Sequence, residues 1–321
     1  MTYEYRDVSQ IVSHPLTPTG LRNLGNTCYL NCSLQILMSS TIFSKEISNI
    51  TVMELSKTNF LREFMRIKIS GDTKMFHSWL IKIYPDYADM NQQDTNECFL
   101  RILDVFEKEF RITTKNLPQP PVLDPSVKPD LVLKRFSLFS WRMNTLTMSN
   151  IYKIFYGQIR SLITCSICKQ EKNNFIPFNS LSIVNAENIA EGLINYQKTE
   201  HINGYECETC KKRTKINKTQ IIWKLPKVLI LQFPMKDLRN LHESLKIEDH
   251  IKKKNFTLRS IGCHSGYSIN SGHYYTFVKY KTMEKHSQWF SISDDEIRLV
   301  KYRDIVNHCS NVYILCYERV N

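Results

Sequence analysis

The sequence lacks any apolar run that approaches the length of a membrane span. Residues 228–233 are typical of its apolar stretches; a run this short fits a buried strand, whereas a spanning helix needs about 20 apolar residues. The first residues are polar and acidic, without the basic start and apolar core of a signal peptide. We therefore expect an intracellular protein, located in the cytoplasm, the nucleus or both, with no membrane span.

Long basic tracts are also missing, and so is a cysteine pattern that would form a disulfide scaffold. The formal net charge is +12, a value that suits nucleic acid, an acidic membrane or an acidic partner. The longest run of cations is Lys252-Lys253-Lys254, which is too short for a binding tail, so we favour a solvated basic surface and expect no nucleic-acid partner. The 10 cysteines among 321 residues are expected as metal ligands, nucleophiles or core residues.

The composition is that of a folded protein, with 42% hydrophobic and 23% charged residues, and the length fits one large domain or two smaller ones. Apolar residues at helical spacing predict a helix after Cys28 and another from about Asp94 to Phe110. Asp94 is expected to cap the second helix, with Glu97 completing a capping box. The first third of the chain is therefore predicted to be helical.

The chain changes character after a proline-rich stretch, residues 117–121, with Pro125 and Pro129 beyond it, which predicts a surface connection. From about residue 150, short segments rich in β-branched and aromatic residues predict strands. The predicted strands include residues 221–223, 228–231, 274–278 and 312–315. Helices first and strands later favour an α+β fold over alternating βαβ units.

Two Cys-x-x-Cys pairs carry the strongest local signal in the sequence. They are Cys165 with Cys168 and Cys207 with Cys210, separated by the 38 residues 169–206. Each pair forms a tight turn that presents two thiolates to one ion, and two such turns complete a tetrahedral zinc site. Four unligated core cysteines are the alternative, but the polar neighbours of both pairs are poor core material. We expect one structural zinc ion and no catalytic cofactor.

A candidate nucleophile lies in the segment formed by residues 20–31. A turn with Gly25 and Asn26 leads directly into the predicted helix, so Cys28 is placed at or beside the helix N-terminus. Unpaired backbone N–H groups and the helix dipole favour a thiolate there. On position alone, a small buried cysteine is an equally good interpretation, and it is the one we give Cys32 and Cys98.

A cysteine nucleophile needs a histidine base. His273 stands out because Gly272 before it permits close approach by a substrate, and an aromatic strand follows it. His264 is a local competitor, and spacing does not separate the two histidines.

These residues form a pattern that resembles the ubiquitin-specific proteases. Gly-Leu-x-Asn-Leu-Gly-Asn-Thr-Cys-Tyr at 20–29 is similar to their Cys box, and Gly-His-Tyr at 272–274 to their His box. Further pieces follow in the family's order: Gln-Gln-Asp-x-x-Glu at 92–97, Phe-Tyr-Gly at 155–157, the two cysteine pairs, Leu-Pro-x-x-Leu at 225–229 and Trp-Phe at 289–290. One departure is residues 232–234, Gln-Phe-Pro, where the family usually continues with Lys-Arg-Phe.

The resemblance implies a papain-like cysteine protease core shaped as a right hand, from residue 20 to the end. Residues 20–150 would form the thumb, 151–225 the zinc-bearing fingers and 226–321 the palm, after an N-terminal extension of residues 1–19. The implied activity is that of a deubiquitinating thiol protease, acting as a monomer on ubiquitin and ubiquitinated proteins. It would hydrolyse the isopeptide bond at the ubiquitin C-terminus.

The resemblance also assigns roles, one residue at a time. Cys28 matches the nucleophile, His273 the base, and Asn23 the side-chain donor to the oxyanion. The residues expected to bind substrate lie beside the path of the ubiquitin tail, whose arginines suit carboxylates. They are Gln92, Asp94, Glu97, Gly272 and Tyr274.

The third triad position departs from the family pattern, which is mostly Trp, three residues, then Asp or Asn followed by Asp. Alignment on Trp289 puts Ser293 at this position, as in a minority of members, and Asp294 at the second acid, which supports the oxyanion through water. A serine can orient His273 but carries no charge to stabilise an imidazolium. The competing register makes Asp294 the orienter; we favour Ser293.

Two alternative functions stay open. One is a protease for another ubiquitin-like modifier, because that choice depends on surface contacts in the fingers and palm. The other is a non-catalytic ubiquitin-binding scaffold, which would need a broken triad, whereas Cys28, His273 and Asn23 are all present.

Overall fold

The computed structural model describes most of the chain, including the start of the segment that resembles the family. The described residues are 18–48, 59–111, 117–122, 124, 126–234, 238–250, 252–268, 271–281 and 286–320. Helices come first and strands dominate after residue 156, so the predicted α+β fold is confirmed. Pro125 and residues 1–17 of the predicted N-terminal extension lie outside the described residues.

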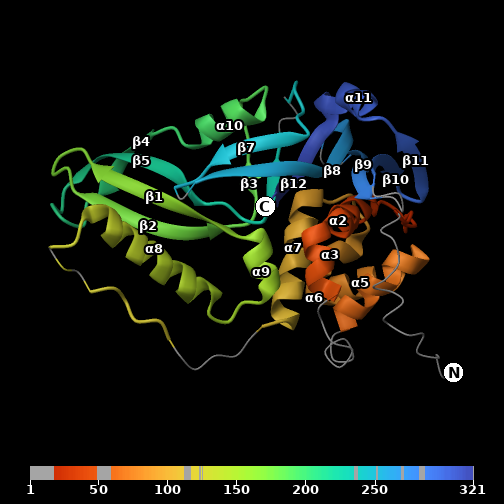
Figure 1. Ribbon diagram of the computed structural model, residues 1–321, viewed down its shortest axis with the longest axis horizontal. Coiled ribbons are helices and arrows are strands. Elements are labelled where there is room, and N and C mark those ends of the chain that lie inside the picture. Colours follow the sequence, from red (N-terminus) through yellow and green to blue (C-terminus); the bar gives the residue numbers. More distant parts are fainter. Residues whose placement is uncertain are drawn as a thin grey trace.

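The first region is a group of helices packed around α2 (Figure 1). Its elements are α2 (Cys28–Ser39), α3 (Thr41–Ser48), α5 (Asn59–Ser70), α6 (Lys74–Ile83), η1 (Pro85–Asp89) and α7 (Thr95–Glu109). Every residue of α2 is buried, because the helix lies between α7 and the strands that follow later in the chain. The predicted cap of α7 is confirmed: the Asp94 side chain accepts the backbone N–H of Glu97 at 2.9 Å.

The second region is a long four-stranded antiparallel sheet with the strand order β2-β1-β5-β4. Its strands are β1 (Gly157–Cys165), β2 (Glu171–Phe178), β4 (Glu200–Glu206) and β5 (Arg213–Lys224). Helix α8 (Pro129–Thr145) lies along this sheet, while the short α9 (Asn150–Phe155) joins it to the first region (Figure 1). The hydroxyl of Ser140 on α8 donates to the carbonyl of Phe175 on β2.

The third region is a twisted eight-stranded sheet. Its strand order is β11-β10-β9-β8-β12-β6-β3, with β7 paired to β8. Its elements are β3 (Leu181–Ser182), α10 (Ile189–Tyr196), β6 (Val228–Gln232), β7 (Ser244–Glu248), β8 (Lys253–Ser268), β9 (Ser271–Lys281), β10 (Ser287–Ser293), β11 (Glu296–Val300), α11 (Tyr302–Ile305), η2 (Val306–Asn311) and β12 (Val312–Val320). β3 and α10 fall within the residues predicted for the fingers, yet β3 pairs with β6, and Ile189 and Leu193 of α10 lie in this sheet's core.

The contact between the helices and the eight-stranded sheet positions the candidate site. One buried cluster unites the apolar faces of α2, α5 and α7 with sheet residues such as Val228, Tyr313 and Ile314. Burial of this much apolar surface, at about 25 cal/mol per Å², holds the N-terminus of α2 against β9. Cys28 therefore lies next to the strand that carries His273. Within the described part of the chain, no helix combines the length and apolar character that crossing a bilayer requires.

Candidate active site

Cys28 is the first residue of α2 and only 3% exposed. Burial raises the pKa of its thiol above the ordinary value, although backbone N–H groups of Tyr274 and Tyr29 donate to the sulfur and lower it. The charge of Asp294 raises the pKa further. The helix N-terminus was expected to favour a thiolate; here the desolvation of the sulfur outweighs the backbone N–H groups.

His273 comes from β9 and faces Ser293, the last residue of β10. Its Nε2 lies 2.8 Å from the Ser293 hydroxyl and 4.0 Å from Oδ2 of Asp294. Antiparallel pairing of β9 with β10 brings the two residues together across the 20 positions that separate them. With Nε2 engaged by Ser293, Nδ1 is the ring nitrogen left for a thiol. Among the hydrogen bonds of the described residues, none joins the Cys28 sulfur to this ring.

Asp294 accepts hydrogen bonds from two asparagines that flank Cys28 in the sequence. Asn23 donates from Nδ2 to Oδ2 of Asp294 at 2.9 Å, and Asn31 donates to Oδ1 at 2.7 Å. The Oδ1 of Asn23 accepts the backbone N–H groups of Gly25 and Thr27, which fixes the orientation of the amide. Asp294 itself has a φ of +53°, because it begins the tight turn between β10 and β11.

Sequence reasoning gave no role to Asn31, which is 3% exposed on α2. A signal was available: Asn31 is polar, yet it lies one turn after Cys28 in a helix whose neighbouring residues are apolar. A buried amide is costly unless it is hydrogen-bonded, so such a position indicates a specific partner.

His264, the competing base, is 1% exposed, whereas the side chain of His273 is 39% exposed. Its ring lies 4.3 Å from that of Tyr274, and its Nε2 is 3.3 Å from the side-chain nitrogen of Gln92. Gly272 has a φ of +151°, and a Cβ there would come within 2.7 Å of the His264 ring and 2.2 Å of a backbone oxygen. Only glycine therefore fits at position 272, against the ring of His264.

The other residues expected to bind substrate are largely engaged within the protein. Glu97 pairs with Arg101 at 2.5 Å. The carboxylate of Asp94 caps α7 and accepts the hydroxyl of Tyr313, a residue that sequence reasoning missed. The side chain of Tyr274 is 1% exposed, so only the backbone of this residue faces Cys28.

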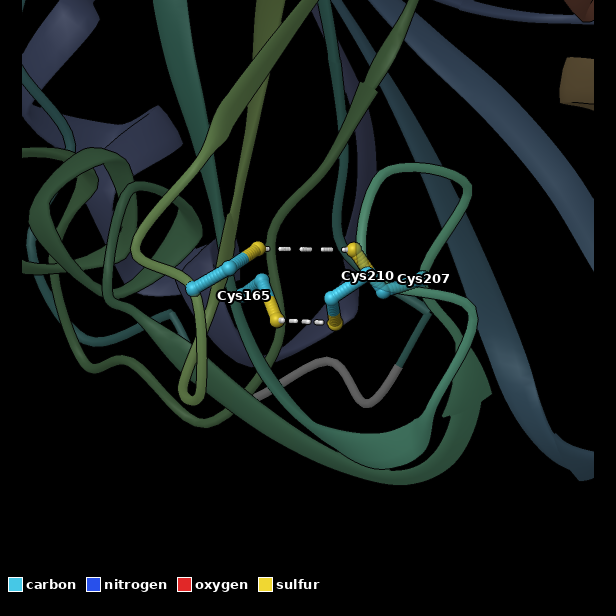
Figure 2. A group of neighbouring side chains, drawn as sticks. Cys165, Cys207 and Cys210 are labelled. Carbon is cyan, nitrogen blue, oxygen red and sulfur yellow. Dashed lines mark hydrogen bonds between the residues drawn. The ribbon is translucent and has the colours of Figure 1, made fainter.

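The four paired cysteines meet at the far end of the four-stranded sheet (Figure 2). Their sulfur atoms all lie within 4.8 Å of one another, with 3.7 Å between Cys168 and Cys207 and 4.0 Å between Cys165 and Cys210. A tetrahedral site with Zn–S bonds of about 2.3 Å would separate its sulfurs by about 3.8 Å. This cluster could therefore bind a metal ion.

The two cysteine turns share one backbone geometry. Each is followed by a lysine with positive φ, Lys169 at +59° and Lys211 at +55°. The N–H of each lysine donates to the carbonyl of the first cysteine in its turn. Backbone N–H groups of Cys210 and Thr209 lower the pKa of Cys207 to about 6, a value that suits a thiolate ligand.

Comparison with known proteins identifies relatives of the chain. The sequence model of the family described as "Ubiquitin carboxyl-terminal hydrolase" matches residues 19–317. The "Probable ubiquitin carboxyl-terminal hydrolase 4" of Schizosaccharomyces pombe is 25% identical over 94% of this chain and 58% of its own length. The "Ubiquitin carboxyl-terminal hydrolase 25" of Arabidopsis thaliana is 24% identical over 95% of this chain and 48% of its own length. The chain thus spans only about half the length of these curated relatives.

Solved structures of similar fold include a deubiquitinase module bound to ubiquitin. The SAGA Ubp8/Sgf11/Sus1/Sgf73 DUB module bound to ubiquitin aldehyde contains a chain with a TM-score of 0.67, at 20% identity, and the match covers 95% of this chain and 70% of that chain. The same module bound to monoubiquitin gives a TM-score of 0.69 at 21% identity.

Proposed function

The chain belongs to the ubiquitin carboxyl-terminal hydrolase family, and from that premise we propose that it is a deubiquitinating thiol protease. It would hydrolyse the isopeptide bond that joins the ubiquitin C-terminus to a substrate protein. The observation that carries this proposal is the meeting of Cys28, at the start of α2, with the backbone that follows His273 on β9. The neighbours of similar fold are described as bound to ubiquitin, which supports the choice of substrate.

The proposed mechanism begins with a neutral thiol, because burial raises the pKa of Cys28. Nδ1 of His273 takes the thiol proton as the sulfur attacks the carbonyl carbon of the last ubiquitin residue. The imidazolium then gives its proton to the departing lysine amine. Water, activated by the same imidazole, hydrolyses the thioester and restores the free thiol.

Asn23 would stabilise the oxyanion of the tetrahedral intermediate. Its Nδ2 carries two hydrogens, and the bond to Asp294 uses one of them. The second hydrogen remains for the oxyanion, a contribution of about 3 kcal/mol. Asn31 would hold Asp294 in place for this purpose.

Ser293 would be the third member of the triad. Its hydroxyl lies 2.8 Å from the imidazole, whereas the nearest Asp294 oxygen lies 4.0 Å away and already accepts from Asn23. This geometry supports the register aligned on Trp289 over the competing one, in which Asp294 orients the ring.

One zinc ion is proposed for the cysteine cluster, with Cys165, Cys168, Cys207 and Cys210 as ligands. The sulfur separations and the lowered pKa of Cys207 suit it. Four protein thiolates would close the coordination sphere, so the role is structural. Residues 20–150 would form the thumb, residues 151–225, which include the four-stranded sheet, the fingers, and residues 226–321 the palm. The protein would be a monomer that works inside the cell.

Reaction with ubiquitin that bears a C-terminal electrophile tests the proposal. A protein that hydrolyses ubiquitin conjugates should form a covalent adduct with this probe and react far more slowly with the same probe built on other ubiquitin-like modifiers. Adduct formation with another modifier alone would redirect the assignment to that modifier. No adduct with any of these probes would favour a binding scaffold.

A further inference from the structure

A polar cavity of about 690 Å³ opens beside the candidate catalytic residues. It lies between the end of η1 and the start of β9, and its lining residues are Asn26, Asp89, Asn91, Gln92, Gln93, Ser271 and Gly272. Asn26 is two residues before Cys28, and Gly272 directly precedes His273, so the cavity adjoins the reacting atoms. Asp89 is the only charged residue in this lining.

The carboxylate of Asp89 is held in place by neutral groups. It accepts the backbone N–H of Asn91 at 2.9 Å, the side-chain amide of Asn91 at 2.8 Å and that of Gln93 at 3.4 Å. These bonds, led by the backbone N–H, lower the pKa of Asp89 and keep it ionised. None of the ion pairs formed by the described residues includes Asp89.

The three neighbouring acids are engaged away from the cavity. Between residues 86 and 97 the chain carries four carboxylates, and Arg101 engages two of them, Asp86 and Glu97. Arg101 also stacks over Tyr84 and Tyr87, which limits its freedom to release them. Asp94 is used by the α7 cap and by Tyr313. Of these four carboxylates, Asp89 alone lines the cavity, and it takes part in none of the ion pairs of the described residues.

We propose that Asp89 binds a cationic side chain of the bound substrate and thereby contributes to substrate selection. The inference rests on the proposed function. A carboxylate held at one edge of a polar cavity suits a guanidinium or ammonium group, as a charge-assisted pair. Two sources offer such a group: an arginine of the ubiquitin tail, or a basic residue beside the acceptor lysine on the leaving side.

Asp89→Asn is the direct test, because it removes the charge and keeps the shape. Substrates would be a fluorogenic ubiquitin C-terminal amide, the same amide with each tail arginine replaced by alanine, and ubiquitin isopeptides with or without a basic residue beside the lysine. Because Asp89 is exposed, we expect kcat/KM to fall by about three- to fivefold. The fall should come from a higher KM and should become smaller at high salt. Asp86→Asn, which leaves Arg101 bound to Glu97, is the matched control and should change little.

The pattern across substrates identifies the source of the cation. A loss on the fluorogenic amide that disappears with one arginine-to-alanine tail identifies the tail. A loss confined to isopeptides with a basic neighbour identifies the leaving side. Equal kcat/KM for the wild type and Asp89→Asn on every substrate would overturn the proposal, as would a loss that is the same on all of them. Either result leaves wild-type hydrolysis, and so the proposed function, intact.

Discussion

The metal cluster and the candidate catalytic site are built in opposite ways. The four cysteines come from two turns that each close over four residues, and the turns meet because β1 pairs directly with β5. The catalytic site instead joins residues that are far apart in the chain: Asn23 and Asp294, which share a hydrogen bond, are 271 positions apart. Local geometry forms the first site, whereas the packing of helices on a sheet forms the second.

Because the two sites are built independently, we expect that damage to one of them leaves the structure of the other intact. Loss of metal should disturb the four-stranded sheet and leave the helix–sheet interface in place. Substitutions at the interface should change catalysis and leave the sheet and its metal in place.

The largest effect is expected from loss of the metal ion. Cys207→Ser, or prolonged chelation, should disorder the end of the four-stranded sheet, because structural zinc sites in small peptides contribute about 10–16 kcal/mol of apparent binding energy. Elemental analysis should find one zinc per wild-type chain, and hydrogen exchange should rise in residues 157–224 of the variant. Active protein without zinc would contradict the metal assignment. Equal loss of protection in α2 would contradict the separation of the two sites.

Asn23→Ala should have the next largest effect. Removal of the oxyanion donor should lower kcat by about 100-fold or more at nearly constant KM, since the contact forms only in the transition state. Steady-state kinetics on a ubiquitin C-terminal amide measures this, and unchanged zinc content is the control. A change in KM alone would assign Asn23 to substrate binding.

Ser293 tests how the base is oriented. Ser293→Ala should lower kcat/KM, because the imidazole loses its hydrogen bond, and Ser293→Asp should retain activity. A carboxylate at this position stabilises the imidazolium. Since the neutral ring is the base, the acid limb of the kcat/KM profile should move to higher pH in Ser293→Asp. Full activity of Ser293→Ala, with an unchanged profile for Ser293→Asp, would make Asp294 the orienter.

The smallest effect is a difference in reactivity towards iodoacetamide. Only the thiolate is alkylated, and burial raises the pKa of Cys28 above its ordinary value. Alkylation of Cys28 in the free protein should therefore be slower at pH 7 than that of Cys28 in the denatured chain, and its rise with pH should begin at a higher pH than in the denatured chain. Peptide mapping after timed alkylation measures the rate. Rapid alkylation at neutral pH would show a preformed thiolate.

The contrast between local turns and long-range packing also explains how much of the structure could be predicted from the sequence. The cysteine cluster and the α7 cap depend on spacings of three residues, which are visible directly. The ion pair of Glu97 with Arg101, four residues on, could also have been predicted from helical spacing. The fold class followed from the order of helical and strand patterns.

Long-range contacts were not predictable in this way. No local pattern connects Asp94 to Tyr313, 219 positions later, or places Asn31 against Asp294. No local pattern assigns β3 and α10 to the eight-stranded sheet either. These features depend on which apolar faces pack together. The resemblance to the family named Cys28, His273 and Asn23, and the burial that raises the Cys28 pKa became visible only in the structure.

The most direct test of the central claim is to locate the adduct formed by the ubiquitin electrophile. Mass spectrometry of the digested adduct should place the ubiquitin tail on Cys28, while Cys28→Ala should form no adduct and should still bind ubiquitin. Hydrolysis of ubiquitin conjugates by Cys28→Ala should fall by at least about 10³-fold. An adduct on any other cysteine, or a smaller fall in turnover for a clean Cys28→Ala preparation, would contradict the account.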